Sequence, residues 1–392
     1  MDNEWSQLKG IKILDVSNFL PGPYATMLLS SFGAEIIKVE APRLGDPIRL
    51  MGLPIYQMLN TNKKSITLNL KTDKGREIFK QLASQSDAVV EGFRPKVMSR
   101  LGLGFEDLQE INPALVYCSI SGFGQDGPYV DKPAHDLNYL ALGGYFSIPS
   151  QVENKVARPN IRLADVTASM FAALSLSIAI AGARQTGQGQ HLDVSIHDVV
   201  TSLMAPMAIM MQAEWGDDIR RMSHIMPDND LFETKDGRFF CVGVMENKFW
   251  LALRDVLKVE FPDITNPAYD DRLGRMKHKL AVHQMLSSIF ASKTLKEWKE
   301  IFEDSDIPCS PVIDHGELLD DPHVKHRNVV RELFDKKSGK KIKQVGFPVK
   351  FSESLNDMRR VPPAMGEHTE EIIVGLGYSK KDIKRFRSGK VI

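Results

Sequence analysis

The chain has 392 residues, 43% of them hydrophobic, so it is long enough for two compact units that each bury a sizeable interior. Lysine plus arginine balance aspartate plus glutamate at 50 each, which removes any general electrostatic argument for nucleic acid or an anionic membrane as a partner. The cysteines, Cys118, Cys241 and Cys309, are widely spaced and form no CxxC pattern, which argues against a disulfide framework or a zinc site and favours a reducing cytoplasm.

Neither a signal peptide nor a membrane span is expected. The first residues, MDNEWSQLKG, are polar and acidic. The longest apolar run, FAALSLSIAIAGA from Phe171, is too short and too rich in serine to cross a bilayer. We therefore expect a cytoplasmic protein with no membrane insertion.

Short apolar runs alternate with segments of helical spacing in the first third of the chain. Strands are expected at residues 11–17, 34–40, 65–70, 87–93 and 114–124, and helices at 22–33 and 73–86. Strands that alternate with helices imply right-handed crossovers and a mostly parallel sheet covered on both faces. The fold class predicted for this part is Rossmann-like α/β.

The nucleotide-binding signatures of that fold class are missing. The first expected strand is followed by SNFLPGPYA rather than GxGxxG, and GxxxxGK[ST] does not occur in the sequence. A dinucleotide dehydrogenase and a P-loop NTPase are therefore disfavoured.

The second half is expected to differ in organisation. Residues 160–215 are predicted to be mostly helical, with a Gly-rich turn and a strand within ARQTGQGQHLDVSIHD, and the polar residues 215–235 are predicted to be a linker. GRFFCVGV then predicts a strand, and helical segments follow to about residue 305 in a second, smaller α/β domain. The tail from about 330 is basic and rich in turns.

Several fragments in fixed order resemble one family. GIKILDVSNFLPGPYATMLLSSFGAEIIKVE, EGFRP, TGQGQHLDVS and PPAMGEHTEEIIVGLGYS are similar to the family III CoA-transferase (CaiB/BaiF) family, closest to its α-methylacyl-CoA racemase branch, from Gly10 to Ile392. The resemblance implies a large Rossmann-like CoA-binding domain at residues 1–215, a linker and small domain at 216–330, and a C-terminal segment, 331–392, that returns to the large domain. It also implies a homodimer of interlocked chains.

Asp165, in RLADVTASM, matches the catalytic aspartate of the family. A carboxylate there can attack an acyl carbon, as in the transferases, or act as a base, as in the racemases. From the residues alone it is equally a helix N-cap, because it precedes a long helical pattern. Asp165 therefore indicates the family without choosing the reaction.

His135 is the residue that discriminates between the two reactions. Racemases of the family carry a GHDINY-like segment where transferases tend to have tyrosine or phenylalanine in place of the histidine, and this chain reads AHDLNY. Racemisation needs an acid and a base on opposite faces of the α-carbon, and histidine titrates near neutrality. The alternative is a helix-start histidine held by local hydrogen bonds.

Asp136 is grouped with the catalytic set as support for His135 or as a helix cap. The same dipeptide at His197-Asp198 lacks the surrounding motif and is interpreted as structural.

Glu246, in CVGVMENKFW, matches a glutamate that pairs with the catalytic histidine in the family's racemases. Asn247 stands where the resemblance implies a proline. A carboxylate beside His135 would fix its tautomer and favour its charged form. The alternative for Glu246 is an ordinary exposed acid at a helix start.

The resemblance also implies a set of CoA-binding residues, with arginines that grip phosphate in bidentate fashion: Lys63, Lys64, Gly92, Phe93, Arg94 and Arg100. The alternative for the two lysines is a solvated basic face. Ala41 replaces the arginine usual in the family near the adenine, and Arg43 is the candidate substitute.

We therefore expect an enzyme that inverts the α-carbon of 2-methylacyl-CoA thioesters by proton abstraction and return. The alternatives are a CoA-transferase that works through an Asp165 acyl anhydride and a non-catalytic acyl-CoA-binding protein. No metal and no cofactor are expected beyond the CoA carried by the substrate. The expected partners are the acyl-CoA and a second copy of the chain, without nucleic acid or membrane.

Overall fold

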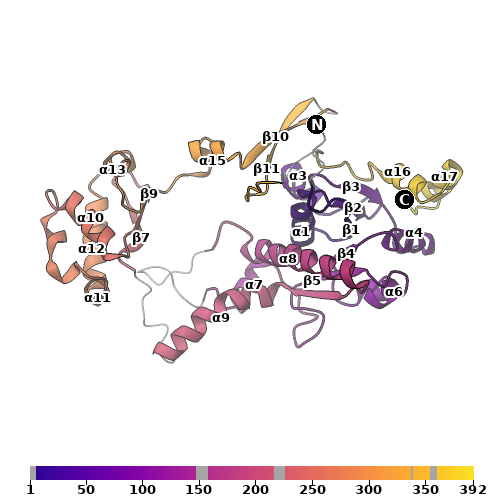
Figure 1. Ribbon diagram of the computed structural model, residues 1–392, viewed down its shortest axis with the longest axis horizontal. Helices are drawn as coiled ribbons and strands as arrows, with labels where there is room; N and C mark the ends of the chain where they lie inside the picture. The colour runs from indigo at the N-terminus through magenta and orange to yellow at the C-terminus, as the bar shows by residue number, and fades with distance from the viewer. Residues whose placement is uncertain (1–5, 147–157, 216–225, 337–338, 354–359) are drawn as a thin grey trace. The chain divides into compact units, whose positions relative to one another are not determined.

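The computed structural model describes residues 6–146, 158–215, 226–336, 339–353 and 360–392, so residues 216–225 of the expected linker lie outside the described residues. The chain divides into two compact units (Figure 1). The large unit comprises Met1–Tyr145, Pro159–Ala213 and His323–Ile392, and the small unit comprises Phe146–Arg158 and Glu214–Pro322.

A six-stranded parallel sheet forms the centre of the large unit, which confirms the fold class expected from the alternating pattern. The strands lie in the order β3-β2-β1-β4-β5-β6. Their bounds are β1 (Lys12–Asp15), β2 (Glu35–Glu40), β3 (Lys64–Thr67), β4 (Ala88–Glu91), β5 (Val116–Ser121) and β6 (His191–Ser195). β4 and β5 are buried along their whole length because helices cover both faces of the sheet.

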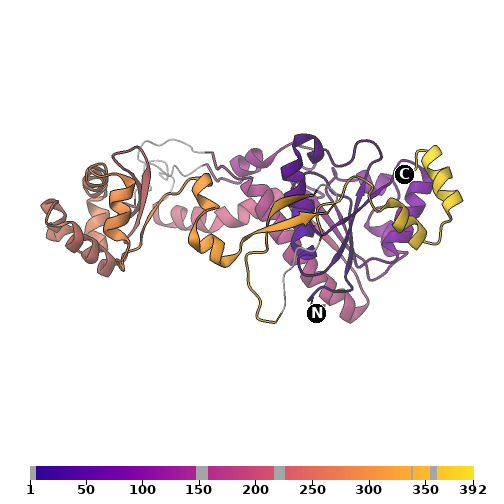
Figure 2. The same ribbon diagram turned by 90° about the horizontal axis from the view of Figure 1, so that it is seen from above.

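Helices form a layer on each face of this sheet (Figures 1 and 2). α1 (Pro21–Ser30) and α8 (Leu163–Thr186) pack against each other on one face. α4 (Asp73–Ala83) and α6 (Phe105–Gln109) contribute to a separate core on the other face. The other helices up to the small unit are α2 (Ile48–Met51), α3 (Leu53–Asn60), α5 (Val97–Arg100), α7 (Asp136–Leu142) and α9 (Ile196–Trp215).

The C-terminal segment packs against the large unit's sheet. After α15 (Pro322–Arg327), the hairpin of β10 (Val330–Asp335) and β11 (Lys340–Val345) leads to α16 (Thr369–Gly375) and α17 (Lys380–Ser388). The Asn69 N–H donates to the Val391 carbonyl (2.7 Å), and the Thr67 N–H donates to Thr369 Oγ1 (3.0 Å). The apolar sides of α16 and α17 join the core beneath α4, so the last residues complete this unit.

The small unit has a three-stranded antiparallel sheet of β7 (Asn229–Glu233), β8 (Phe239–Gly243) and β9 (Cys309–Pro311). Its helices are α10 (Asn247–Leu257), α11 (Arg272–Lys277), α12 (Lys279–Phe290), α13 (Leu295–Phe302) and α14 (His315–Leu318), with 3₁₀ turns at Pro262–Thr265 and Pro267–Tyr269. Trp250, Trp298 and Phe290 anchor its core. The linker prediction to residue 235 was wrong at its end, because β7 pairs with β8 despite its polar sequence.

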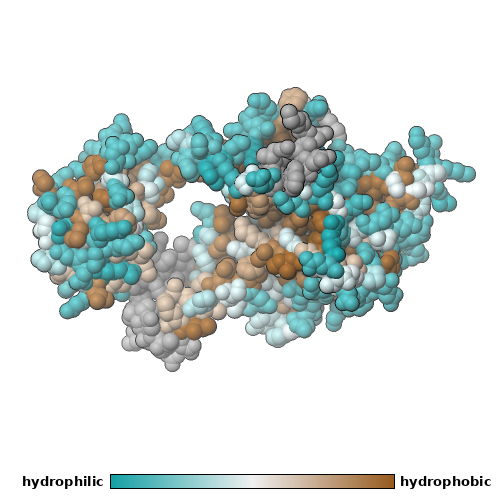
Figure 3. All heavy atoms as spheres, in the orientation of Figure 1, coloured by the Kyte–Doolittle hydropathy of each residue, from teal (hydrophilic) through white to brown (hydrophobic). Residues whose placement is uncertain are grey.

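α8 is the longest described helix, and its two sides differ. Within the described residues it is the one helix long and apolar enough to cross a membrane by length and composition, with 44% of its most apolar stretch buried. Ala168, Ala172 and Leu176 are fully buried, whereas Met170, Phe171, Leu174 and Ile178 are 48, 41, 57 and 65% exposed. Hydrophobic residues gather over α8 on the face that Figure 3 turns to the viewer. The inner side of α8 is core, and its outer side is uncovered in the single chain.

Candidate active site

A hydrogen bond between Asp136 and Asp165 joins the starts of the helices α7 and α8. Arg162, the residue before α8, makes no side-chain capping bond, so the first N–H groups of α8 need acceptors from elsewhere. Asp136, the first residue of α7, supplies one: its Oδ1 accepts the Asp165 backbone N–H (3.1 Å). Asp136 is almost fully buried. The carboxylate of Asp136 thus acts as a cap that fixes where Asp165 lies relative to α7.

Asp165 is the third residue of α8, and its carboxyl group is partly buried. Burial, reinforced by the nearby charge of Asp136, raises the pKa of Asp165 to about 7, although Arg162 opposes the shift. Tyr139 of α7 is in the same cluster; burial, with the charges of Asp165 and Asp136, raises the pKa of its hydroxyl to about 12. A carboxyl group that titrates near neutral pH can both take and return a proton.

His135 immediately precedes α7. Its backbone N–H donates to the Asn138 side chain (3.0 Å), and Tyr139 donates to the neighbouring Ala134 carbonyl (3.1 Å). These bonds hold the backbone, and the His135 side chain is exposed. The start of α7 is therefore fixed while the imidazole is accessible to a ligand.

The second copy of the dipeptide has a different environment. His197 and Asp198 begin α9, and the His197 ring packs against Phe123 with ring centroids 5.5 Å apart. His197 Nδ1 lies 3.5 Å from Asp198 Oδ1, and the Asp198 side chain is 78% exposed. This pair makes a local contact at a helix start, and it serves as a control for His135 and Asp165.

The order of the parallel strands reverses between β1 and β4. Ser17 follows β1 and Gly92 follows β4, and a Cβ on Gly92 would lie 3.4 Å from the Ser17 Cβ. In open α/β sheets, ligands bind outside the carboxyl ends of the strands at this reversal. The Glu91 side chain accepts the Phe93 N–H (2.8 Å) and so shapes the turn, while Arg94 and, in α5, Arg100 are exposed. These four expected CoA residues, Gly92, Phe93, Arg94 and Arg100, thus lie on or just after that turn.

The structure argues against a phosphate role for the two lysines. Lys63 is fully buried, and its ammonium binds Asp15 (2.9 Å) and the Pro23 carbonyl (2.8 Å). Burial lowers the pKa of Lys63 to about 8, although Asp15 opposes the shift. Lys64 pairs with Glu35 (3.0 Å) and with Glu371 of α16 (2.9 Å). Both ammonium groups hold parts of the large unit together, because Lys63 is bound to Asp15 and Lys64 lies between Glu35 and Glu371.

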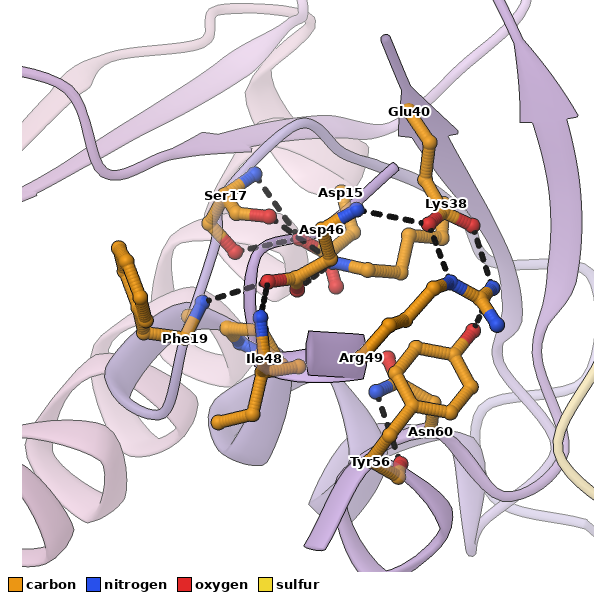
Figure 4. A network of polar contacts seen from close by, with 12 residues as sticks. Asp15, Ser17, Phe19, Lys38, Glu40, Asp46, Ile48, Arg49, Tyr56 and Asn60 are labelled. Atoms are coloured by element: carbon orange, nitrogen blue, oxygen red, sulfur yellow. Dashed lines mark hydrogen bonds and ion pairs between the residues drawn. The ribbon is translucent and has the colours of Figure 1, made fainter. Parts of the chain in front are cut away.

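Sequence reasoning missed the buried ionic network behind the loop that follows β1 (Figure 4). The Lys38 ammonium binds Asp46 (2.9 Å) and donates to the Ser17 carbonyl (2.8 Å). Asp46 Oδ1 accepts the Phe19 N–H (3.1 Å) and the Ile48 N–H (3.0 Å). Removing one partner of a buried pair typically costs about 3–5 kcal/mol, so this loop is held firmly.

The network binds the backbone of Phe19 and leaves its side chain accessible to solvent. Its backbone has φ of 63°, in the left-handed region that a phenylalanine rarely adopts, yet 48% of the residue is exposed. The strain is sustained by the Asp46 bond to its N–H. The network therefore holds an aromatic ring close to the carboxyl end of β1, where a ligand is expected.

Glu246 belongs to the small unit. It is the residue immediately before α10, and its side chain is exposed. Its expected pairing with His135, which belongs to the large unit, stays a prediction.

The raised pKa of Asp165 makes the protein's stability depend on pH. Because the pKa rises from 3.8 to about 7 on folding, the neutral carboxyl group favours the folded state below pH 3.8, and this contribution is lost as the pH rises through 7. Asp165→Asn, which does not titrate, is expected to gain about 2 kcal/mol in free energy of unfolding over the wild type between pH 4 and pH 8. This gain is about half of the free energy that corresponds to the whole pKa shift, because the side chain is partly exposed and solvent screens its charge. Urea unfolding at both pH values measures the gain, and a difference independent of pH would contradict it.

Known proteins similar to this chain include both transferases and a racemase. The family model for CoA-transferase family III matches residues 8–369. Human succinyl-CoA:glutarate CoA-transferase is 32% identical, over 100% of this chain and 91% of that protein. Human alpha-methylacyl-CoA racemase is 30% identical, over 98% of this chain and 97% of that protein. The crystal structure of a CAIB/BAIF family protein from Brucella suis superposes with a TM-score of 0.83 at 25% identity, covering 95% of this chain and 99% of that one.

Proposed function

The chain belongs to CoA-transferase family III, as its motifs indicated, and on that premise we propose that it is an acyl-CoA racemase. The proposed substrate is a 2-methylacyl-CoA thioester, whose α-carbon is inverted by removal and return of a proton. The observation that carries the proposal is Asp165, whose pKa lies at about 7 and whose backbone is tied to the start of α7, directly after the accessible His135. Acid–base chemistry requires such a group, because a carboxyl group of ordinary pKa is a weak base and is almost never protonated at neutral pH.

In the proposed mechanism, His135 and Asp165 act on opposite faces of the α-carbon. One of them removes the α-proton, and the electron pair moves onto the thioester carbonyl to form an enolate. The other then donates a proton to the opposite face, which breaks its own bond to that proton and restores the thioester. The reverse reaction exchanges the two roles. The N-terminal end of α8 favours the negative charge that develops on the thioester oxygen.

The binding roles are proposed from position. Gly92, Phe93 and the exposed Arg94 and Arg100 are proposed to hold the CoA, because they lie on or just after the turn at the strand-order reversal. Glu246 is proposed to support the protonation state of His135. No further cofactor enters the proposed reaction, because an α-proton beside a thioester can be removed by side chains alone.

A CoA-transferase is the second candidate, and the activity named for the human relative at 32% identity favours it. In that reaction ionised Asp165 attacks the acyl carbonyl and expels CoA as its thiolate, which leaves a mixed anhydride on the protein. The thiolate then attacks the aspartyl carbonyl, which releases the first acid as its carboxylate and leaves CoA as a thioester on Asp165. A second carboxylate displaces the thiolate from this thioester to form a new anhydride, and attack of the thiolate on the new acyl carbonyl gives the product acyl-CoA and frees Asp165. Hydroxylamine trapping at Asp165 that requires an acyl-CoA donor would support this candidate.

The enzyme is proposed to act as a homodimer. The support is the apolar outer side of α8, where four large side chains are 41–65% exposed in the single chain (Figure 3). Contiguous exposed apolar patches are rare on soluble monomers, and they often mark a contact with another protein chain. Sedimentation of the full chain is expected to give twice the mass of 44.0 kDa, and a monomer at micromolar concentration would contradict the dimer.

The racemase proposal is tested with a single enantiomer of a 2-methylacyl-CoA and no second carboxylic acid. The enzyme is expected to invert that enantiomer until the two forms are equal, as followed by polarimetry or chiral chromatography of the released acid. Retention of the starting enantiomer across several acyl chains, with CoA exchange on addition of a free acid, would replace the racemase with the transferase.

A further inference from the structure

The small unit contains a fully buried arginine directly behind Glu246. Arg275 lies on α11 and has no exposed surface. Its Nε donates to Asp228 Oδ2 (2.8 Å), its Nη1 donates to the Tyr269 carbonyl (3.1 Å), and its guanidinium lies 4.9 Å from the ring centroid of Trp250. The charge is therefore paired within the core of the unit.

The remaining nitrogen of Arg275 holds both neighbours of Glu246. Nη2 donates to the Met245 carbonyl (2.8 Å) and to Asn247 Oδ1 (3.3 Å). Asp228, the ionic partner of Arg275, also binds this segment through its backbone, because its carbonyl accepts the Val244 N–H (2.7 Å). Arg275 and Asp228 thus bind the chain from Val244 to Asn247 at three points, while the Glu246 side chain is exposed.

The contacts continue into α10. The Glu246 carbonyl accepts the Phe249 N–H (3.0 Å) and the Trp250 N–H (3.1 Å), so the direction of the Glu246 backbone sets the start of the helix. Trp250 is fully buried and packs under the guanidinium. The ion pair therefore fixes the residue before Glu246, the residue after it and the helix that it begins.

Stability alone does not explain an arginine at this place. Replacing a buried ion pair by well-packed apolar residues is often neutral or stabilising, so such pairs are weak evidence for a stabilising role. A planar guanidinium offers several donors in a fixed fork, which sets direction as well as attraction. Asn247 accepts one of these bonds through its side chain. A proline at this position would have no acceptor in its side chain.

We propose that Arg275, paired with Asp228, is a positioning residue that aims the Glu246 carboxylate for its part in the reaction. The proposal rests on the proposed function of Glu246. Neither Arg275 nor Asp228 contacts substrate in it, and both act through the segment Val244–Asn247.

The test uses the full chain and a variant that removes one contact without opening the core. Asn247→Ala deletes the Oδ1 acceptor and leaves the Arg275–Asp228 pair intact. It is expected to lower kcat for inversion by about 5–20-fold with little change in KM or in melting temperature. A misplacement of about 1 Å can cost about 10²-fold, and the loss of one of three contacts is expected to displace the segment by less than that. Faster amide hydrogen exchange across residues 244–250 is expected at the same time.

The matched comparison is made with Glu246→Gln. If Asn247 acts through Glu246, then Asn247→Ala adds no further loss of kcat in the Glu246→Gln background. Arg254→Met is the control arginine: Arg254 lies on α10 and pairs with Asp270 (2.8 Å), so its replacement is expected to leave kcat within about twofold, because a partly exposed ion pair contributes little. Arg275→Lys keeps the charge without the fork and is expected to reproduce the loss seen for Asn247→Ala.

The outcomes separate the two proposals. Losses that multiply, so that the double variant is slower than Glu246→Gln by the full factor of Asn247→Ala, overturn the positioning role and leave the function of Glu246 in place. An Asn247→Ala enzyme with unchanged kcat and unchanged hydrogen exchange overturns the positioning role in the same way. Unchanged kcat in Glu246→Gln itself overturns the role of Glu246, and the positioning role with it. A wild-type enzyme that inverts the substrate no faster than the uncatalysed reaction overturns the proposed function.

Discussion

Asparagine in place of Asp165 is expected to lower kcat for inversion by about 10³-fold. The amide has the size of the carboxyl group but neither takes nor returns a proton. The local structure is expected to persist, because the bond between α7 and α8 uses the Asp165 backbone N–H and the Asp136 side chain (3.1 Å). The loss is measured as the initial rate of inversion from each enantiomer. In deuterated water, exchange of the α-proton is expected to disappear from one enantiomer and to persist from the other, whose proton faces His135.

Asp198→Asn is the matched control for this result. Asp198 is also the third residue of a long helix, α9, but its side chain is 78% exposed and lies beside His197. A general effect of removing an acid from the first turn of a helix would appear in both variants. We expect Asp198→Asn to keep kcat within about twofold, because the change on an exposed helix start is small. More than a tenth of the wild-type kcat in Asp165→Asn would contradict an acid–base role for Asp165.

Phenylalanine in place of His135 is expected to remove inversion almost completely, by about 10²–10⁴-fold, the usual contribution of a single acid or base. The side chain is exposed and its backbone bond to Asn138 (3.0 Å) is independent of the imidazole, so the fold is expected to be unaffected. The exchange pattern should mirror that of Asp165→Asn. The enantiomer that keeps its exchange in one variant should lose it in the other, because each residue serves one face.

His197→Phe provides the control for the histidine. His197 is the second residue of α9 and belongs to the same His-Asp dipeptide, and its ring already packs against Phe123 with centroids 5.5 Å apart, so phenylalanine fits there. We expect full activity in this variant. A His135→Phe enzyme that retains acyl-CoA chemistry dependent on a free acid would assign the protein to the transferases.

The large unit's fold was readable from the sequence because its strands are short apolar runs separated by amphipathic helices. Every strand expected in the first 124 residues overlaps one of β1 to β5, and the strand after the Gly-rich turn is β6. The apolar and polar pattern of the sequence did not predict strands whose residues are mostly polar. β7 reads as a polar linker because only one of its residues, Phe232, is fully buried against the small unit's core. The β10–β11 hairpin is rich in charged residues and has one buried residue, Gln344, so its sequence shows no apolar alternation that would predict strands.

The site was less readable, because side-chain roles depend on neighbours distant in the sequence. Asp136 was expected as a support or a cap, but its acceptor role toward α8 needs 29 residues of chain to fold back. Lys63 and Lys64 read as a basic patch, yet the first is buried against Asp15 and the second binds Glu35 and Glu371. Buried Lys38 and Arg275 have the residue types of surface positions, and only the folded chain supplies their partners.

In the proposed racemase, His135 and Asp165 flank one carbon atom. The most direct measurement is a crystal structure of the enzyme with an unreactive 2-methylacyl-CoA analogue, in which the distances from the α-carbon to the two side chains are measured. For a racemase we expect His135 and Asp165 on opposite faces, each within about 3–4 Å of that carbon. An Asp165 oxygen directed at the carbonyl carbon, with the His135 imidazole turned away from the acyl group, would contradict it and favour CoA transfer.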